Sequence, residues 1–196
     1  LTKSFVEDFG LNGSFSLNSS GFVKNYNTNV FEKVIINDLL FDTNPKIMSN
    51  GLRSNFNFLI KNINAQSSMS KKYKEDESYR VVSLMQYNLS YPLLKKTENY
   101  KNSFKPMMAL KLSPNNTKNI QDEDRRLDIA NIYTLNRIGS NDNIEEGASL
   151  TYGFEYLKSN KADKDVMEAS LANVLRIKES DTLPNQSSLG DKTSDI

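Results

Sequence analysis

The sequence predicts an all-β protein, and more narrowly an antiparallel up-and-down transmembrane β-barrel, with about eight strands of a larger barrel in this chain. Three observations lead to this prediction. Apolar side chains recur at every second residue over most of the chain, which is the period of a strand and not of a helix. The alternating segments are long, about 10–15 residues, and about 9–11 residues carry a tilted strand across a bilayer. Longer and shorter polar connections alternate between them, as in barrels of this kind.

Six segments carry the alternation along the chain. Apolar residues occupy odd positions in segments 5–17, 81–93 and 167–177, even positions in 104–112 and 144–156, and positions 56, 58 and 60. Each segment is therefore expected to be a strand with one apolar face. Segment 127–135 is the one candidate for a short helix. Pro92 and Pro106 are expected near strand ends, where the missing N–H does least harm.

The connections between these strands differ in length. Short ones are expected at 18–21, 43–46, 95–101 and 159–164, an intermediate one at 28–32, and longer ones at 65–77, at 114–143 and from 179 onward. A soluble meander has no reason to alternate in this way, whereas a barrel with tight turns at one end and extended loops at the other does.

The two faces of these strands leave two architectures open. In a soluble β-sandwich the apolar face is the core, whereas in a barrel it meets lipid and the polar face lines a wet interior. The polar face carries Asn88, Lys105, Lys111, Glu155 and Arg176, and the apolar face carries aromatic residues near strand ends, Tyr87, Tyr91, Tyr152, Phe154 and Tyr156. Such aromatic residues suit an interfacial girdle, so the barrel is favoured and the sandwich remains the alternative.

Composition excludes several classes of function. The 196 residues contain no Cys and no His, which removes zinc fingers, disulfides, thiol nucleophiles and Ser-His-Asp triads from this part of the protein. The net charge of +1 argues against a strongly basic surface for nucleic acid. No apolar run approaches the roughly 18 residues of a membrane-spanning helix. We therefore expect no enzyme, no cofactor and no metal site. The strand pattern predicts that residues 1–196 are part of a larger β-barrel domain, with no second domain visible.

Charged residues in the longest connection suggest two kinds of contact. Arg137, Asp142 and Glu145 form either a buried ion pair between this loop and the barrel wall or ordinary exposed charges. Asn131 and Tyr133 are candidates to anchor the same loop in the interior. Two charge clusters, 122–126 in this connection and 71–77 in an earlier one, are expected to be solvated loop charges rather than sites for cations or phosphate.

Two neighbouring features concern the following strand. Glu146 is expected on the apolar face at the strand start, near lipid headgroups. Gly147 and Gly153 fall on the polar face, where they either leave room for a loop or allow a bend and tight strand packing.

The stretch from Tyr79 to Ile196 resembles the outer-membrane lipopolysaccharide-assembly family LptD, also called organic solvent tolerance protein. Its most specific motif joins Asn131, Arg137, Gly139, Asp142, Glu145 and Gly147 to a strand that contains Tyr152 and Gly153. Two further stretches are similar to the family: Leu-Ser-Tyr-Pro-Leu at 89–93 with Phe-Lys-Pro at 104–106, and Leu-Arg at 175–176 with later Ser-Leu and Ser-Asp pairs. Asn143, Glu146 and Gly190 depart from the usual pattern.

The resemblance implies a mid-to-late part of a large C-terminal barrel in the outer membrane. Such a barrel receives lipopolysaccharide from a periplasmic bridge and releases it into the outer leaflet through a lateral gate. The implied partners are lipopolysaccharide, outer-membrane lipid, the plug lipoprotein LptE and the bridge protein LptA, with no nucleic acid. A different outer-membrane barrel, such as a porin or receptor, is the other reading of the pattern.

Overall fold

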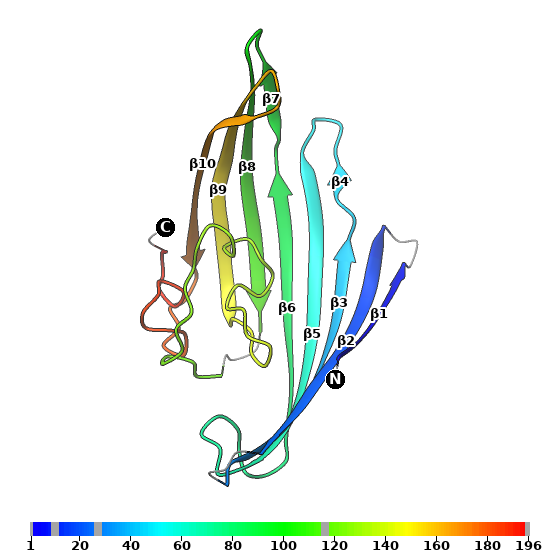
Figure 1. Ribbon diagram of the computed structural model, residues 1–196, viewed down its shortest axis with the longest axis vertical. Helices are drawn as coiled ribbons and strands as arrows, with labels where there is room; N and C mark the ends of the chain where they lie inside the picture. Colours follow the sequence, from blue (N-terminus) through cyan, green and yellow to red (C-terminus); the bar gives the residue numbers. More distant parts are fainter. Residues whose placement is uncertain (1, 9–11, 26–28, 115–117, 195–196) are drawn as a thin grey trace.

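The chain forms one antiparallel sheet, shown in the computed structural model of Figure 1. The structure describes residues 2–8, 12–25, 29–114 and 118–194. The strands within these ranges are β1 (Thr2–Asp8), β2 (Gly13–Asn25), β3 (Phe31–Thr43), β4 (Lys46–Ile47), β5 (Arg53–Ser68), β6 (Ser78–Ser90), β7 (Leu93–Lys96), β8 (Tyr100–Ser113), β9 (Gly147–Asn160) and β10 (Asp165–Arg176). The all-β, antiparallel, up-and-down prediction is confirmed.

The sheet is a strip with two edges. Eight strands follow each other as neighbours in the order β1-β2-β3-β5-β6-β8-β9-β10, while β4 pairs with β5 and β7 pairs with β8. Because β1 and β10 lie at opposite edges and do not pair within the described residues, the sheet is open. A sandwich would need a second sheet on the apolar face, and the strands described here belong to one sheet.

The strands have the lengths expected from the alternation. Apart from β1, β4 and β7, they run for 12 to 16 residues. Two boundaries were predicted wrongly. Segment 5–17 spans β1 and the start of β2, and segment 18–21, expected to be a turn, lies inside β2. The odd-position pattern stays in phase across the connection between these strands, so it gives no sign of the break, and residues 9–11 lie outside the described ranges.

Pro106 lies in the middle of β8 and not near its end, which corrects the expectation. Its carbonyl accepts a hydrogen bond from the Tyr91 N–H over 3.0 Å, and in an antiparallel strand a residue's N–H points to the same side as its C=O. The missing N–H of Pro106 therefore faces the break between β6 and β7. Pro92 lies in this break, directly after the end of β6, as predicted. Neither proline removes a ladder hydrogen bond.

Long connections gather at the lower end of the sheet in Figure 1. They comprise 69–77, 114–146 and the segment after β10, whereas β9 and β10 are joined by four residues at the other end. The predicted alternation of long and short connections is thus present. The short helix predicted at 127–135 is wrong: residues 129–138 form turns, in which the N–H groups of Asn131 and Ile132 bond to the Asp128 carbonyl. No described helix has the length and apolar character needed to span a membrane.

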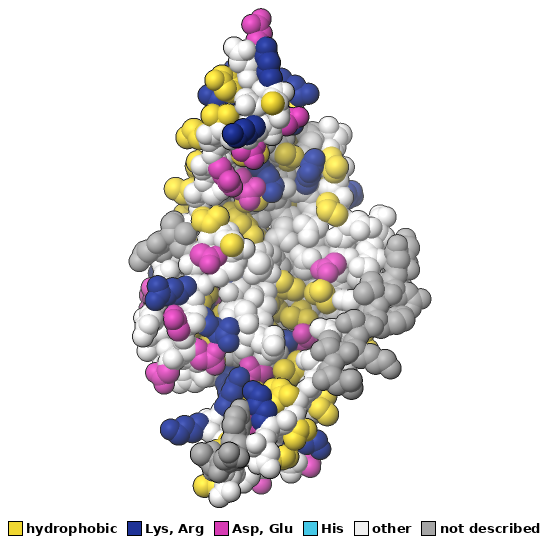
Figure 2. All heavy atoms as spheres, viewed as in Figure 1, with side chains coloured by type: hydrophobic (Ala, Val, Ile, Leu, Met, Phe, Trp, Pro, Cys, Tyr) yellow, Lys and Arg dark blue, Asp and Glu magenta, His cyan; other side chains and the backbone are white. Residues whose placement is uncertain are grey.

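The outward face of the sheet, defined as the face away from the 118–146 loop, is apolar and uncovered. Along β8 the outward Leu110 and Leu112 are 51% and 45% exposed, and Leu171 of β10 is 50% exposed. Tyr152 and Phe154 also lie on this face, but in the middle of β9 and not at a strand end as expected for a girdle. Figure 2 views the loop side, where charged side chains of both signs are spread over a largely polar surface.

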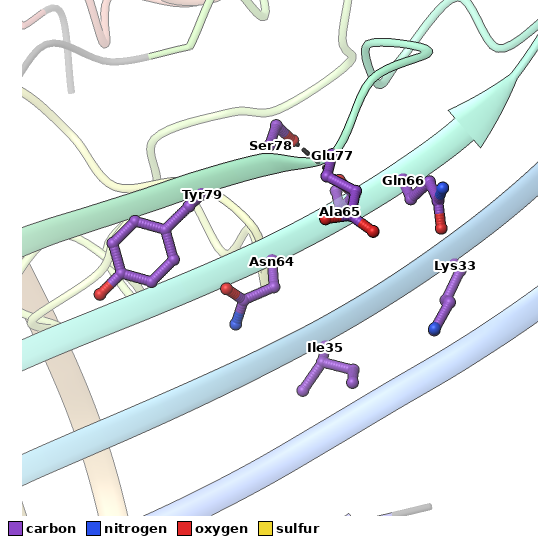
Figure 3. A pocket seen from close by; sticks show the side chains of 8 residues that line it. All are labelled: Lys33, Ile35, Asn64, Ala65, Gln66, Glu77, Ser78 and Tyr79. Carbon is purple, nitrogen blue, oxygen red and sulfur yellow. Dashed lines mark hydrogen bonds between the residues drawn. The ribbon is translucent and has the colours of Figure 1, made fainter.

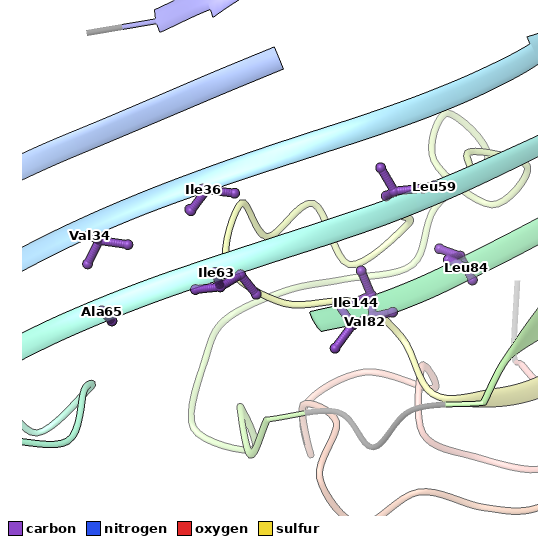
Figure 4. Packing of buried hydrophobic residues seen from close by; sticks show 8 residues of the cluster. All are labelled: Val34, Ile36, Leu59, Ile63, Ala65, Val82, Leu84 and Ile144. Carbon is purple, nitrogen blue, oxygen red and sulfur yellow. The ribbon is translucent and has the colours of Figure 1, made fainter. Parts of the chain in front are cut away.

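The inward face, on which the 118–146 loop packs, holds the core. On β3, β5 and β6 this face carries Val34, Ile36, Leu59, Ile63, Ala65, Val82 and Leu84, which pack with Ile144 of the loop (Figure 4). A second cluster joins the loop to the segment after β10 through Ile120, Ile138, Leu183 and Leu189, and a third joins Ile132 to β10. The prediction that the inward face is polar and exposed to water is therefore wrong at this end of the sheet, because loop residues cover the face there.

Candidate functional site

The 118–146 loop is held on the inward face by a buried charge network centred on Glu145. Arg137 Nε lies 2.6 Å from Glu145 Oε2 and Arg137 Nη2 lies 2.5 Å from Oε1. Arg176 Nη1 of β10 also contacts Oε1, and Lys111 Nζ of β8 lies 3.6 Å from Oε2. All four side chains are at most 3% exposed. One carboxylate thus meets three cationic side chains from the loop and two strands.

Strand register brings these side chains together. Ser149 of β9 pairs with Lys111 on one side and with Arg176 on the other, so all three face inward side by side. Arg137 then reaches the wall between them, where it donates to Ser149 Oγ over 2.7 Å and to Thr151 Oγ1 over 3.0 Å. The guanidinium is therefore satisfied by two strand hydroxyls in addition to the carboxylate, which is what a buried charge requires.

Backbone contacts fasten the same network to both flanking segments. Lys111 Nζ donates to the Thr134 carbonyl over 2.9 Å, and Arg176 Nη2 donates to the Glu146 carbonyl over 2.6 Å. Burial alone raises the pKa of Glu145, but the charges of Arg137, Lys111 and Arg176 outweigh it and hold the pKa well below its usual range. A carboxylate that stays ionised and fully paired has no proton to exchange, so this arrangement fixes structure.

Asp142 belongs to a second cluster and does not contact Arg137. Its carboxylate accepts hydrogen bonds from Tyr73 Oη and Ser140 Oγ, each over 2.8 Å, and lies 3.1 Å from Lys72 Nζ and 3.7 Å from Lys118 Nζ. Burial raises the pKa of Asp142, but the hydrogen bonds from Ser140, Tyr73 and Lys72 prevail and lower it to about 2. Of the two options predicted for these charges, a buried ion pair with the wall holds for Arg137 and Glu145. Asp142 instead connects this loop to the 69–77 connection.

A cleft of about 450 Å³ opens beside this second cluster. It is lined by Lys72, Lys74, Arg80 and Lys118 together with Tyr73, Tyr79 and Asp142. Lys118 Nζ also lies 4.5 Å from the centre of the Tyr73 ring. Lys72, placed by the sequence in a solvated tip, is in fact part of the contact between the two connections.

Gly153 lies where a side chain would collide with both the neighbouring strand and the loop. A Cβ at this position would lie 2.2 Å from the Leu171 carbonyl oxygen and 2.8 Å from Tyr133 Oη. The first distance shows tight packing of β9 against β10, and the second shows that the absent side chain leaves space for Tyr133 of the loop. Both roles predicted for Gly153 are therefore present. Tyr133 also contributes its carbonyl, which accepts a hydrogen bond from Gln86 Nε2 over 2.8 Å.

Gly147 opens β9 with a φ of +81°, a conformation that glycine adopts easily. The change of chain direction there corrects two predictions. Glu146 does not lie on the apolar outward face: its carboxylate accepts hydrogen bonds from Ser180 and Thr182 in the segment after β10. Ile144 is likewise buried in the inward core and not on the outward face. The alternation predicted for 144–156 starts only at β9.

The remaining motif residues have local roles or lie elsewhere. Asn131 bonds to the backbone of Asp128 and Arg126 within the loop, not to the wall. Gly139 is the last residue of a turn, in which its N–H donates to the Asn136 carbonyl. Tyr152 lies on the outward face. Charges at 122–126 pair locally, Arg125 with Glu123 and Arg126 with Asp124. Within the described residues, no group of acidic side chains could hold a metal ion.

Sequence reasoning missed two buried contacts. Tyr73 was not singled out, although its hydroxyl reaches Asp142 across 69 residues of sequence. The inward Lys61 of β5, 3% exposed, forms an ion pair with Asp38 of β3 at 2.6 Å. A charge at an inward position beside apolar neighbours was the available signal for Lys61, since buried charges in proteins are paired.

Comparison with known protein families identifies the family of this chain. The family model described as LptD: LPS transport system D matches residues 47–196, about three quarters of the chain. The match includes the stretch from Tyr79 that carries the resemblance in sequence, and it also covers Ile47 of β4 and the whole of β5. None of the curated protein sequences matches this chain.

Proposed function

Because the chain belongs to the LptD family, LPS transport system D, we propose that its sheet is part of an outer-membrane β-barrel that delivers lipopolysaccharide to the outer leaflet. Family membership gives the general function, lipopolysaccharide transport and assembly in envelope biogenesis. The barrel, its place in the membrane and its action as a translocon are the proposal.

The sidedness of the sheet supports the proposal most directly. The outward face presents leucines and aromatic residues to the surroundings, whereas the inward face carries the ion pairs and the folded loop. A water-soluble protein would cover its apolar face, because roughly 25 cal/mol is gained per Å² of apolar surface removed from water. A barrel wall has the reverse arrangement, with lipid against the apolar face and the polar groups inside.

The open edges of the sheet fit a partial barrel, with residues 1–196 as one part of a larger C-terminal domain. Strands of 12–16 residues are long enough to cross a bilayer at a tilt. A pairing on the outer edge of β10 begins at Thr193, which bridges Leu175, and the Ser194 N–H bonds to the Val174 carbonyl. In an outer-membrane barrel, further strands of the same protein pair with both edges, so no ladder group is left unpaired in lipid.

The proposed activity is movement of a lipid and not covalent chemistry, so no catalytic group and no cofactor is assigned. The 118–146 loop, held inside the wall by Glu145 and Ile144, narrows the interior at the end that carries the long connections. By family, the partners are the plug lipoprotein LptE and the periplasmic bridge protein LptA, and the location is the outer membrane.

Two experiments test this function. The full-length protein should be extracted from membranes only with detergent and should change its gel mobility on boiling, as folded barrels do; a protein soluble without detergent would contradict the barrel. Depletion of the protein should lower surface lipopolysaccharide, and expression of the wild-type gene should restore it. Unchanged surface lipopolysaccharide during depletion would refute the transport function.

A further inference from the structure

Two adjoining hollows mark the outward face near the end that carries the long connections. One hollow, of about 420 Å³, lies over β2 and β3 and is lined by residues 19–23 and 33–35. The other, of about 400 Å³, lies over β3, β5 and β6 and is shown in Figure 3. Both are lined by Lys33 and Ile35, so they flank one short stretch of β3.

The first hollow has an apolar lining, and it is open because a side chain is missing from its floor. Gly21 of β2 has no Cβ, and a Cβ there would lie 3.0 Å from the Val34 carbonyl oxygen and 3.5 Å from Ile35 Cγ1. Beside it, Val23 and Ile35 remain 67% and 46% exposed. This shape and composition suit an acyl chain, which gains dispersion contacts from a preformed apolar groove.

The second hollow lies next to the first and is more polar than it. Figure 3 shows Lys33 and Gln66 close together on one side of it and Tyr79 on the other. Asn64 and Glu77 supply a further amide and a carboxylate. These groups donate to and accept from sugar hydroxyls, whereas a glycerophospholipid headgroup offers few such partners.

Lys33 lies between the two hollows, and its ammonium group is free to bind a ligand. It is exposed, and it forms no ion pair with another residue in the part of the chain that the structure describes. Lysine side chains at the end of an apolar face lay their methylenes on it and hold the ammonium at the polar boundary. An ammonium in that position binds a phosphate group by a charge-assisted hydrogen bond.

We propose that these hollows form one binding site for a phosphorylated glycolipid, lipopolysaccharide itself, on the outer wall of the sheet. One acyl chain lies in the groove over Gly21, a phosphate binds Lys33, and the sugar lies over Asn64 and Gln66. The site rests on the proposed function, because it requires the outward face to meet the membrane. It is separate from the interior network around Glu145.

Native mass spectrometry of the full-length protein in detergent tests the site. The probes are lipopolysaccharide without O-antigen, phosphatidylglycerol and phosphatidylethanolamine, each added at the same concentration. Lys33→Gln should bind the lipopolysaccharide about tenfold more weakly, the loss expected for one charge-assisted hydrogen bond. Lys158→Gln, a matched control on the outward face of β9 near the opposite end, should bind it like the wild type.

A second pair of variants tests the groove. Gly21→Val should fill it and weaken lipopolysaccharide binding, whereas Ala169→Val on the outward face of β10 should not. Heat-dependent gel mobility confirms that each variant is folded. Equal losses in Lys33→Gln and Lys158→Gln, or equal binding of phosphatidylglycerol and lipopolysaccharide by the wild type, would overturn the site.

The outcome is separable from that of the transport function. The comparison of Lys33→Gln with Lys158→Gln measures binding by the purified protein and requires no transport. Binding by Lys33→Gln at the wild-type level would overturn the site and leave the transport function standing. Failure of transport itself is measured by depletion of the whole protein.

Discussion

The 118–146 loop is attached to the inward face in two regions of different character. Over β8, β9 and β10 it is held by charges, with Glu145 between Arg137, Arg176 and Lys111. Over β3, β5 and β6 it is held by apolar packing of Ile144. Apolar packing tolerates small changes in position, whereas paired charges in a dry site require one geometry. The charged region therefore sets where the loop lies, and the apolar region adds favourable burial.

The two regions should also fail differently. Removal of one partner from a buried ion pair leaves the others desolvated and unpaired, which costs more than the pair itself contributes. Truncation of an apolar side chain costs the lost burial and the cavity left behind, an amount that falls as neighbours relax. Four experiments separate these behaviours.

The largest effect is expected for Glu145→Gln. The substitution leaves Arg137, Arg176 and Lys111 buried without their carboxylate, at a cost of about 3–5 kcal/mol. The loop should detach from β8–β10. Trypsin should then cleave after Arg137, whose side chain is 1% exposed in the native fold. Limited proteolysis of the full-length protein in detergent, followed by mass spectrometry, measures this cleavage.

Glu155→Gln is the matched control. Glu155 pairs with Lys105 at 3.2 Å, but the two side chains are 50% and 39% exposed. Solvent-screened pairs contribute about 0–1 kcal/mol, so cleavage after Arg137 should stay at the wild-type rate. Equal cleavage in both variants would show that the network around Glu145 does not hold the loop.

The apolar region should respond next most strongly, through Leu84→Ala. Leu84 is completely buried on the inward face of β6, so truncation should lower the free energy of unfolding by about 2–4 kcal/mol. Leu110→Ala on the outward face, where the side chain is 51% exposed, should cost about 1 kcal/mol or less. Urea unfolding in detergent measures both. An equal loss would remove the distinction between the two faces.

The sequence predicted which face of a strand a residue occupies, because the alternation within one strand contains that information. It did not predict which residues of neighbouring strands lie side by side. Alternation placed Lys111 and Arg176 on the polar face, and the motif spacing allowed a pair between Arg137 and Glu145. Their meeting depends on the register in which Ser149 opposes both Lys111 and Arg176. Single-sequence periodicity contains no register between strands, so the four-residue network could not be predicted.

The loop contacts were hidden for a second reason. Ile144 has the same parity as the outward residues of β9, but it lies before Gly147, whose positive φ changes the direction of the chain. The alternation of β9 therefore does not extend back to Ile144. Tyr73 reaches Asp142 from a connection 69 residues earlier. Neither a turn of this kind nor a contact between two loops leaves a periodic trace in the sequence.

Acid should weaken the polar attachments and leave the apolar region unaffected. The pKa of Asp142 is lowered to about 2 in the folded protein from an ordinary value of 3.8. A lowered folded-state pKa stabilises the fold above the ordinary value and loses that contribution as pH falls toward 2. The difference in urea midpoint between wild type and Asp142→Asn should therefore be constant above pH 5 and shrink between pH 4 and pH 2. A difference that does not change with pH would contradict the assignment.

The smallest effect is expected for Tyr73→Phe, which separates the two kinds of attachment within one side chain. The ring remains packed against the apolar core and beside Lys118, while the hydroxyl that donates to Asp142 over 2.8 Å is lost. The loss of one hydrogen bond should cost about 1 kcal/mol. Because that bond also lowers the pKa of Asp142, the acid transition should move to higher pH. Tyr87→Phe, on the outward face, should change neither the urea midpoint nor the acid transition. A large loss of stability at neutral pH with an unmoved acid transition would mean that Tyr73 acts through packing alone.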